Sequence, residues 1–98
     1  MDFEKSDNGE CLKVLLVGEL DAVNAPELEQ CLRDEILGVK RLEFDLKELE
    51  YVSSAGLRVF LCMQKIMNAQ GSMIIRNVNE EVMSIFQVSG FTKLLNIE

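Results

Sequence analysis

Histidine and tryptophan are absent from the 98 residues of this chain, proline occurs once, and the three cysteines lie far apart. Without histidine, the chain cannot use His-based acid–base catalysis, a His triad or a metal site with His ligands. Cys11, Cys31 and Cys62 form no Cys-x-x-Cys pair and are odd in number, which does not indicate a disulfide framework. All three lie in apolar stretches, which favours buried, reduced thiols in a cytoplasmic protein.

Positive charge is also scarce. The chain has ten Lys and Arg residues and seventeen Asp and Glu residues, which gives a net charge of −7. This balance disfavours nucleic acid and anionic membrane surfaces, since both attract cationic side chains. The sequence shows neither the basic and apolar segments of a signal peptide nor an apolar run of about 20 residues, so we expect no membrane insertion. The acidic surface favours a basic protein partner.

The composition is typical of one globular domain that spans residues 1–98. Hydrophobic residues make up 48% of the chain and charged residues 28%, which argues against disorder. No linker, repeat or low-complexity segment divides the sequence, and its length suits a single core. We therefore predict one domain.

The first segment predicts a β-hairpin, with a strand near Asp2–Lys5 and another near Cys11–Val17. Between them, Asn8-Gly9 is a strong signal for a two-residue type I′ turn, in which both central residues need positive φ. Within the second strand, Val14–Val17 is continuously apolar. Such a run is typical of a strand that is covered on both faces, so we expect helices on both sides of the sheet.

The next segment predicts a helix and a strand. Asn24 and Glu27 have the spacing of a capping box, and the apolar residues that follow recur at helical intervals until Gly38. Arg41–Leu46 then alternates between polar and apolar residues, which predicts a strand with one buried face.

The remaining sequence predicts a long helix over Ser54–Gln70, a strand over Ser72–Arg76, and a helix capped by Asn79 that ends near Gly90. Leu94–Ile97 is expected to form a last short strand. The resulting order, β-β-α-β-α-β-α-β, predicts an α/β domain with a mixed sheet and packed helices.

The residues Ser53-Ser54-Ala55-Gly56 occupy the predicted junction between a strand and the long helix. Unpaired N–H groups at a helix start favour an anion there. A serine at that point can cap the helix, or it can carry a phosphate that the helix end stabilises. From the pattern alone, capping is the more common of the two roles.

Three segments together resemble the STAS family, the sulfate transporter and anti-sigma factor antagonist domains. Gly18–Leu28 (GELDAVNAPEL) resembles the G-E-L-D segment of the family, Tyr51–Leu57 (YVSSAGL) its phosphorylation loop, and Val88–Leu94 (VSGFTKL) its S-G-L-like ending. They follow the family order and spacing, so the resemblance covers nearly the whole chain. It implies a STAS-like α/β fold.

Free-standing anti-sigma factor antagonists are the branch that the chain resembles most. In such proteins the STAS domain binds an anti-sigma factor that is also a serine kinase, a GHKL-type ATPase, and thereby frees a sigma factor. The kinase ends the binding by phosphorylating a loop serine, and a serine phosphatase reverses the modification. The resemblance implies that Ser54, two residues before Gly56, is the phosphoacceptor. It implies no catalytic residue, cofactor or metal.

Six residues are expected to support this serine or to contact the partner: Ser53, Asp21, Asn24, Ala55, Gly56 and Arg58. Ser53 replaces the aspartate that often stands there in the family pattern. Ala55 and Gly56 are small, and we expect them to leave room for a partner's active site.

Several of these residues also have a purely structural interpretation. Ser53 and Ser54 are both candidates for the helix N-cap, and Asp21 for a capping or solvated loop carboxylate. Asn24 is favoured as a cap over a contact. Arg58 is either solvated beside the loop or part of a partner interface, and the sequence does not choose between them.

An enzyme is not expected. The chain has no G-x-x-x-x-G-K-[ST] loop, no carboxylate cluster with metal-binding spacing, and no His or Lys beside Ser54 that would activate it as a nucleophile. The main alternative function is a STAS-like accessory subunit of a transporter assembly, such as a lipid-transport ABC complex, in which the serine loop only docks. A scaffold protein of a stress-sensing complex is a third alternative, although such proteins usually carry a sensory domain.

Overall fold

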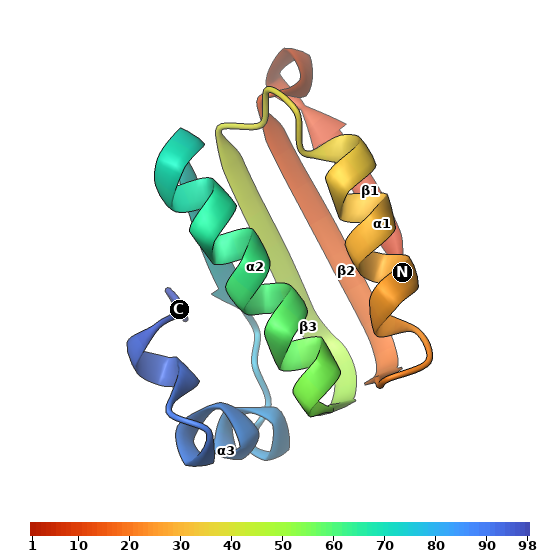
Figure 1. The fold of residues 1–98 in the computed structure, drawn as a ribbon, viewed down its shortest axis with the longest axis vertical. Coiled ribbons are helices and arrows are strands. Elements are labelled where there is room, and N and C mark those ends of the chain that lie inside the picture. Colours follow the sequence, from red (N-terminus) through yellow and green to blue (C-terminus); the bar gives the residue numbers. More distant parts are fainter.

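The computed structural model, which describes residues 1–98, has the strands and helices in the predicted order as far as the third helix (Figure 1). The strands are β1 (Asp2–Ser6), β2 (Cys11–Leu20), β3 (Arg41–Val52) and β4 (Ser72–Arg76), and the helices are α1 (Ala25–Glu35), α2 (Ser54–Gln70) and α3 (Glu80–Val88). Two short 3₁₀ turns cover Asp7–Gly9 and Phe91–Lys93. None of the helices has the length and apolar character needed to cross a bilayer.

The strands form one mixed sheet in the spatial order β1-β2-β3-β4. β1 and β2 are antiparallel, while β2, β3 and β4 run parallel and are joined by α1 and α2. In the register of β2 and β3, Leu20 lies opposite Val52, so both strands end at the same level. The loops that follow them therefore begin side by side. The predicted mixed sheet is confirmed.

The helices pack on one face of the sheet. Figure 1 shows α1 and α2 lying over the same side of β2 and β3. A chain of aromatic rings joins the layers, because Phe60 of α2 makes edge-to-face contacts with Phe44 of β3 at 5.1 Å and with Phe86 of α3 at 5.8 Å between ring centroids. All three rings are fully buried. The core thus lies between the helices and one face of the sheet.

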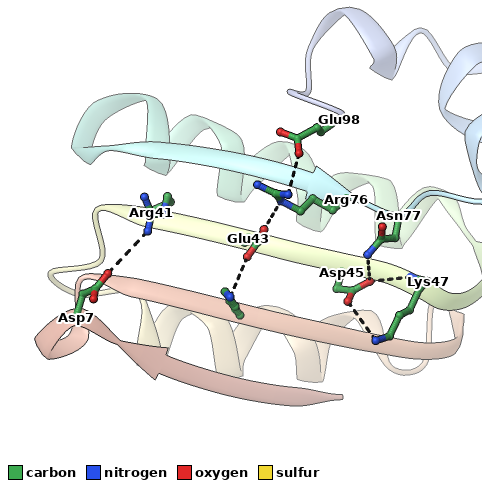
Figure 2. A network of polar contacts seen from close by, with 9 residues as sticks. Asp7, Arg41, Glu43, Asp45, Lys47, Arg76, Asn77 and Glu98 are labelled. Atoms are coloured by element: carbon green, nitrogen blue, oxygen red, sulfur yellow. Dashed lines mark hydrogen bonds and ion pairs between the residues drawn. The ribbon is translucent and has the colours of Figure 1, made fainter.

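The opposite face of the sheet is open, and the expectation of helices on both sides is wrong. Val14 and Leu16 are buried, but Val17 is 55% exposed and Leu15 is only partly covered. On this face Glu43 forms ion pairs with Lys13 and Arg76, as seen from the open side in Figure 2. The run Val14–Val17 places apolar residues on both faces of β2. The sequence pattern therefore resembles that of a strand covered on both faces, although helices cover only one.

The hairpin between β1 and β2 is confirmed, but its two-residue turn is wrong. The last paired residues are Ser6 and Cys11, so four residues connect the strands. Asn8 and Gly9 have positive φ, as predicted, and Asp7 adds a third residue with φ of 55°. The extra left-handed residue lengthens the turn, which the short Asn-Gly signal does not indicate.

The predicted last strand is reduced to a single bridge between Ile75 of β4 and Ile97. The Ile75 N–H donates to the Asn96 carbonyl oxygen, and the Glu98 N–H donates to the Ile75 carbonyl oxygen, both at 2.9 Å. Leu94, the first residue of the predicted strand, instead has helical φ and ψ and ends the 3₁₀ turn Phe91–Lys93.

The cysteines are all free thiols, as expected, but they differ in burial. Cys11 is buried and is the first residue of β2. Cys31 of α1 and Cys62 of α2 are only half-buried, so the expectation that all three lie in the core is wrong for these two.

Candidate functional site

The predicted site residues lie at the edge of the sheet where the parallel strands end. This edge carries the turn Asp21–Asn24 after β2, the Ser53 junction after β3, and the residues 77–79 after β4. Hydrogen bonds join these segments: the Ser53 N–H donates to the Leu20 carbonyl oxygen at 2.8 Å, and the Asn79 side-chain amide donates to the Leu49 carbonyl oxygen at 2.7 Å. The carboxyl ends of parallel strands are a common place for binding sites.

Ser53 is the N-cap of α2. Its backbone is extended, with φ of −82° and ψ of 174°, and its Oγ accepts a hydrogen bond from the Gly56 N–H at 3.2 Å. Its carbonyl oxygen accepts from the Leu57 N–H at 2.9 Å. Of the two serines, Ser53 therefore satisfies the helix start, and its hydroxyl is occupied by that role.

Ser54 is the first residue of α2, and its side chain is exposed. Its hydroxyl makes no hydrogen bond within the chain. Because Ser53 takes the N–H groups of Gly56 and Leu57, the N–H groups of Ser54 and Ala55 are left without an acceptor. The structure thus presents an unconstrained hydroxyl beside two unpaired donors at a helix start, where a negative charge is favoured.

Gly56 holds the start of α2 close to the sheet. It is buried, and a Cβ atom built on it would lie 2.8 Å from Leu20 Cδ2 and 2.9 Å from Val52 Cγ1. We expected Gly56 to leave room for a partner, but its missing side chain faces the core instead. Ala55 is half-buried and Ser54 is exposed, so the outward surface of this turn begins at Ser54.

Asp21 and Asn24 cap each other. The Asp21 Oδ1 accepts from the N–H groups of Val23 at 2.9 Å and of Asn24 at 3.0 Å. The Asn24 Oδ1 accepts in return from the Asp21 N–H at 2.8 Å, and its amide donates to the Glu19 carbonyl oxygen at 2.7 Å. This reciprocal pair has the geometry of a capping box.

The capping box predicted for Asn24 and Glu27 is therefore wrong by one turn. Asn24 already has helical φ and ψ of −95° and −13° and makes no N-cap hydrogen bond, whereas an N-cap residue is extended. The turn begins at Asp21, whose carbonyl oxygen accepts from the Ala25 N–H at 2.9 Å. The spacing Asp21-x-x-Asn24 was the signal that the sequence offered.

Arg58 lies one turn after Ser54 and is exposed. It takes part in none of the ion pairs of the molecule. Together with Glu29 and Arg33 of α1 it lines a shallow groove of about 280 Å³ between α1 and α2. In that groove Glu29 and Arg33 are already paired with each other at 3.3 Å.

The acidic side chains at this edge have no ion-pair partners. Glu50, Glu80 and Glu81 line one open hollow near the ends of β3 and β4, and Asp21 follows the end of β2. None of the seven ion pairs of the molecule includes these carboxylates. The sequence interpretation did not place Glu50, Glu80 and Glu81 at the site, because net charge does not reveal where charge gathers. No group of three or more potential metal ligands comes together.

The family model of the STAS domain matches residues 2–98. The chain belongs to the STAS domain family. This STAS chain is 34% identical to the BtrV protein of Bordetella bronchiseptica over 84 residues, which cover 84% of the chain and 72% of BtrV. It is 29% identical over 98 residues to the anti-sigma-B factor antagonist of Bacillus subtilis, with 99% of the chain and 88% of that protein covered.

Solved structures of the anti-sigma factor antagonist SpoIIAA share the STAS fold of this chain. The unphosphorylated form superposes with a TM-score of 0.82 at 22% identity and covers 99% of this chain and 88% of SpoIIAA. The phosphorylated form from Bacillus superposes with a TM-score of 0.73 at 21% identity, with 99% and 91% covered. The names of the Bacillus subtilis relative and of SpoIIAA describe regulators and not enzymes, in agreement with the expectation from the sequence.

Proposed function

We propose that this STAS protein is an anti-sigma factor antagonist that binds an anti-sigma factor while Ser54 is unphosphorylated and releases it after Ser54 is phosphorylated. The observation that carries the proposal is the division of roles between two adjacent serines. Ser53 caps α2 with its hydroxyl, whereas the Ser54 hydroxyl is exposed and makes no hydrogen bond. The names of the relatives support the antagonist role.

The partner in this proposal is an anti-sigma factor with serine kinase activity, of the GHKL ATPase type. The kinase transfers the γ-phosphoryl group of ATP to Ser54 Oγ, so that a phosphorus–oxygen bond forms, ADP leaves and the hydroxyl proton is lost. A serine phosphatase hydrolyses the ester and restores the hydroxyl. The kinase supplies the base that accepts this proton, since the neighbours of Ser54, which are Ser53, Ala55 and Gly56, include none.

Charge explains why the phosphate would end binding. A phosphoserine adds about −1.5 to −2 charges at neutral pH. The edge of the sheet where the parallel strands end already carries the unpaired carboxylates of Asp21, Glu50 and Glu80. In an interface that fits a neutral hydroxyl, desolvation of the added charge costs several kcal/mol, and about 4 kcal/mol is a thousandfold in affinity.

The acidic edge also supports a basic docking surface on the partner. The net charge of −7 and the gathering of unpaired carboxylates at this edge disfavour nucleic acid and anionic lipid. The free thiols of Cys11, Cys31 and Cys62 suit the reducing cytoplasm, where sigma factors act.

The proposal is tested by capture from native lysate on three baits, the parent protein, Ser54→Ala and Ser54→Glu, followed by mass spectrometry. The parent and Ser54→Ala are expected to retain a GHKL-type ATPase, and added ATP should release it from the parent only. Ser54→Glu should bind less well. Ser84→Ala, at an exposed serine of α3, is the matched control and should behave like the parent.

Phosphate found on Ser53 instead, or a Ser54→Ala bait from which ATP still releases the ATPase, would contradict the assignment. Equal binding of Ser54→Glu and the parent, with no phosphate on any serine, would contradict the switch. Recovery of a membrane ABC complex in place of the ATPase would favour the transporter-subunit alternative.

A further inference from the structure

We propose that Arg58 forms an ion pair with the phosphate on Ser54 and holds it over the first turn of α2. The inference rests on the proposed function, which supplies the phosphate, and assigns Arg58 a regulatory role within the same site. This role differs from the two that the sequence leaves open for Arg58, solvation beside the loop and contact with a partner.

The helix places the two residues together. Ser54 and Arg58 are four positions apart in α2, which runs without interruption over Ser54–Gln70. Residues at this spacing are neighbours on one face, with Cβ atoms about 5–6 Å apart, and an anion that precedes the cation is the favourable order. Both side chains are exposed, whereas Gly56 and Leu57 between them are buried, as one outward face requires.

No other group holds the guanidinium of Arg58. The acidic residue that shares its groove is Glu29, whose carboxylate is paired with Arg33 of the same helix at 3.3 Å. In the turn after β2, the Asp21 Oδ1 is occupied by the N–H groups of Val23 and Asn24. Arg58 is therefore free to turn toward a new anion on its own helix.

The helix start supplies further donors for the same phosphate. The N–H groups of Ser54 and Ala55 have no acceptor in the chain. A phosphate has three strong acceptor oxygens, and a guanidinium offers donors in a planar fork that matches them. Two backbone donors and Arg58 can thus satisfy the group within the domain, without a change in the fold.

The charges around the phosphate make the contribution of Arg58 measurable. We expect the unpaired carboxylates of Asp21, Glu80 and Glu81 at this edge to disfavour the dianion of the phosphate, whereas a cation beside the phosphate favours the dianion. From α1, the paired Glu29 and Arg33 contribute charges of opposite sign. Removal of Arg58 therefore leaves the negative groups unopposed.

The test uses the full chain with phosphoserine installed at position 54 by codon suppression, so that no kinase is required. Phosphorus NMR is used to titrate the second pKa in the Arg58 parent, in Arg58→Gln and in Lys65→Gln. Lys65 is the matched control, because it is an exposed, unpaired cation of α2 about 16 Å along the axis from Ser54. That distance exceeds the screening length at physiological salt.

We expect the second pKa, near 6 for free phosphoserine, to be about 0.15 to 0.4 higher in Arg58→Gln than in the parent, and unchanged in Lys65→Gln. Phosphoserine at 54 should also raise the melting temperature more in the parent than in Arg58→Gln. Equal pKa values in the parent and Arg58→Gln would overturn the ion pair. A kinase that modifies a serine other than Ser54 would instead contradict the proposed function and leave this measurement valid.

Discussion

The Ser53 N–H donates to the Leu20 carbonyl oxygen at 2.8 Å, and this bond joins the ends of the two central parallel strands. It fixes the level at which α2 begins, because the next residue, Ser54, is already helical. The position of the exposed Ser54 hydroxyl is therefore fixed by the sheet and by the Ser53 cap, and not by a flexible loop. Small changes in this junction should alter the site as well as the stability.

Replacement of Gly56 by alanine tests the close packing of this junction. In an exposed helix position Gly→Ala stabilises by about 1 kcal/mol. Here the new Cβ would lie 2.8 Å from Leu20 Cδ2 and 2.9 Å from Val52 Cγ1, so we expect overpacking to lower the free energy of unfolding by about 1–3 kcal/mol. Urea unfolding measures the change. A midpoint equal to or above that of the parent would show that the contact relaxes without cost.

Substitutions at the two serines should have different effects, because Ser53 contributes to stability and Ser54 to regulation. Ser53→Ala removes the cap that accepts from the Gly56 N–H, and we expect a loss of about 1 kcal/mol in urea unfolding. Ser54→Ala removes a hydroxyl without hydrogen bonds and should change stability by less than about 0.5 kcal/mol. In a kinase assay the order reverses, since Ser53→Ala is expected to be phosphorylated and Ser54→Ala is not. Equal stabilities of the two variants would contradict the capping role.

Much of this site could be predicted from the sequence, because its signals are local. The order of strands and helices, the junction at Ser53 and the start of α2 at Ser54 follow from short patterns that the structure keeps. The open sheet face could not be predicted, since the run Val14–Val17 is apolar on both sides of the strand. The helices leave this face of the strand uncovered, and polar residues from distant parts of the chain, Glu43 and Arg76, pair with each other on it.

The gathering of unpaired carboxylates at one edge of the sheet could not be predicted either. Glu80 and Glu81 lie in the first turn of α3, where acidic residues are favourable, and this local role is all that their position in the sequence indicates. Their position beside Glu50 depends on the pairing of β3 with β4, which no local pattern encodes. The role of Asn24 was missed for a related reason, because its partners Asp21 and Glu19 precede the helix instead of following it.

Asp45, on the open face, should make stability depend on acid pH (Figure 2). Burial alone would raise the pKa of its carboxyl, but hydrogen bonds from the Asn77 amide and the Lys47 N–H, together with the Lys47 charge, lower it below the ordinary value of 3.8. A carboxyl with a lowered pKa in the folded state stabilises above its unfolded pKa, and this contribution disappears as pH falls through the folded value. The relevant window therefore lies below about pH 4.

We expect an NMR titration of Asp45 to give a pKa below 3.8. Asp45→Asn should lower the free energy of unfolding relative to the parent at pH 7, and the difference should shrink below pH 4. Asn77→Ala should move the pKa of Asp45 upward, because the amide hydrogen bond to Asp45 Oδ1 at 3.0 Å is lost. A measured pKa at or above 3.8 in the parent would remove this source of pH dependence.

Association with the partner should depend on salt, because the acidic edge attracts a basic surface at long range. Raising the ionic strength from about 0.05 to 0.5 M shortens the screening length of the electrostatic attraction. The on-rate should therefore fall by about tenfold or more. The double variant Glu80→Gln and Glu81→Gln should show a slower on-rate at low salt and a weaker salt dependence. Stopped-flow or surface-based kinetics with the purified anti-sigma factor provides the measurement.

Glu10→Gln is the matched control for the acidic edge. Glu10 is an exposed carboxylate without an ion pair, but it precedes β2 at the opposite end of the sheet. If local attraction at the site governs association, this variant should keep the on-rate and salt dependence of the parent. Because this variant removes one charge and the double variant removes two, half the loss of the double variant would show that only the total charge of −7 matters. An on-rate that stays flat across the salt range would remove electrostatic attraction from the mechanism, and the switch would then depend on contacts at Ser54 alone.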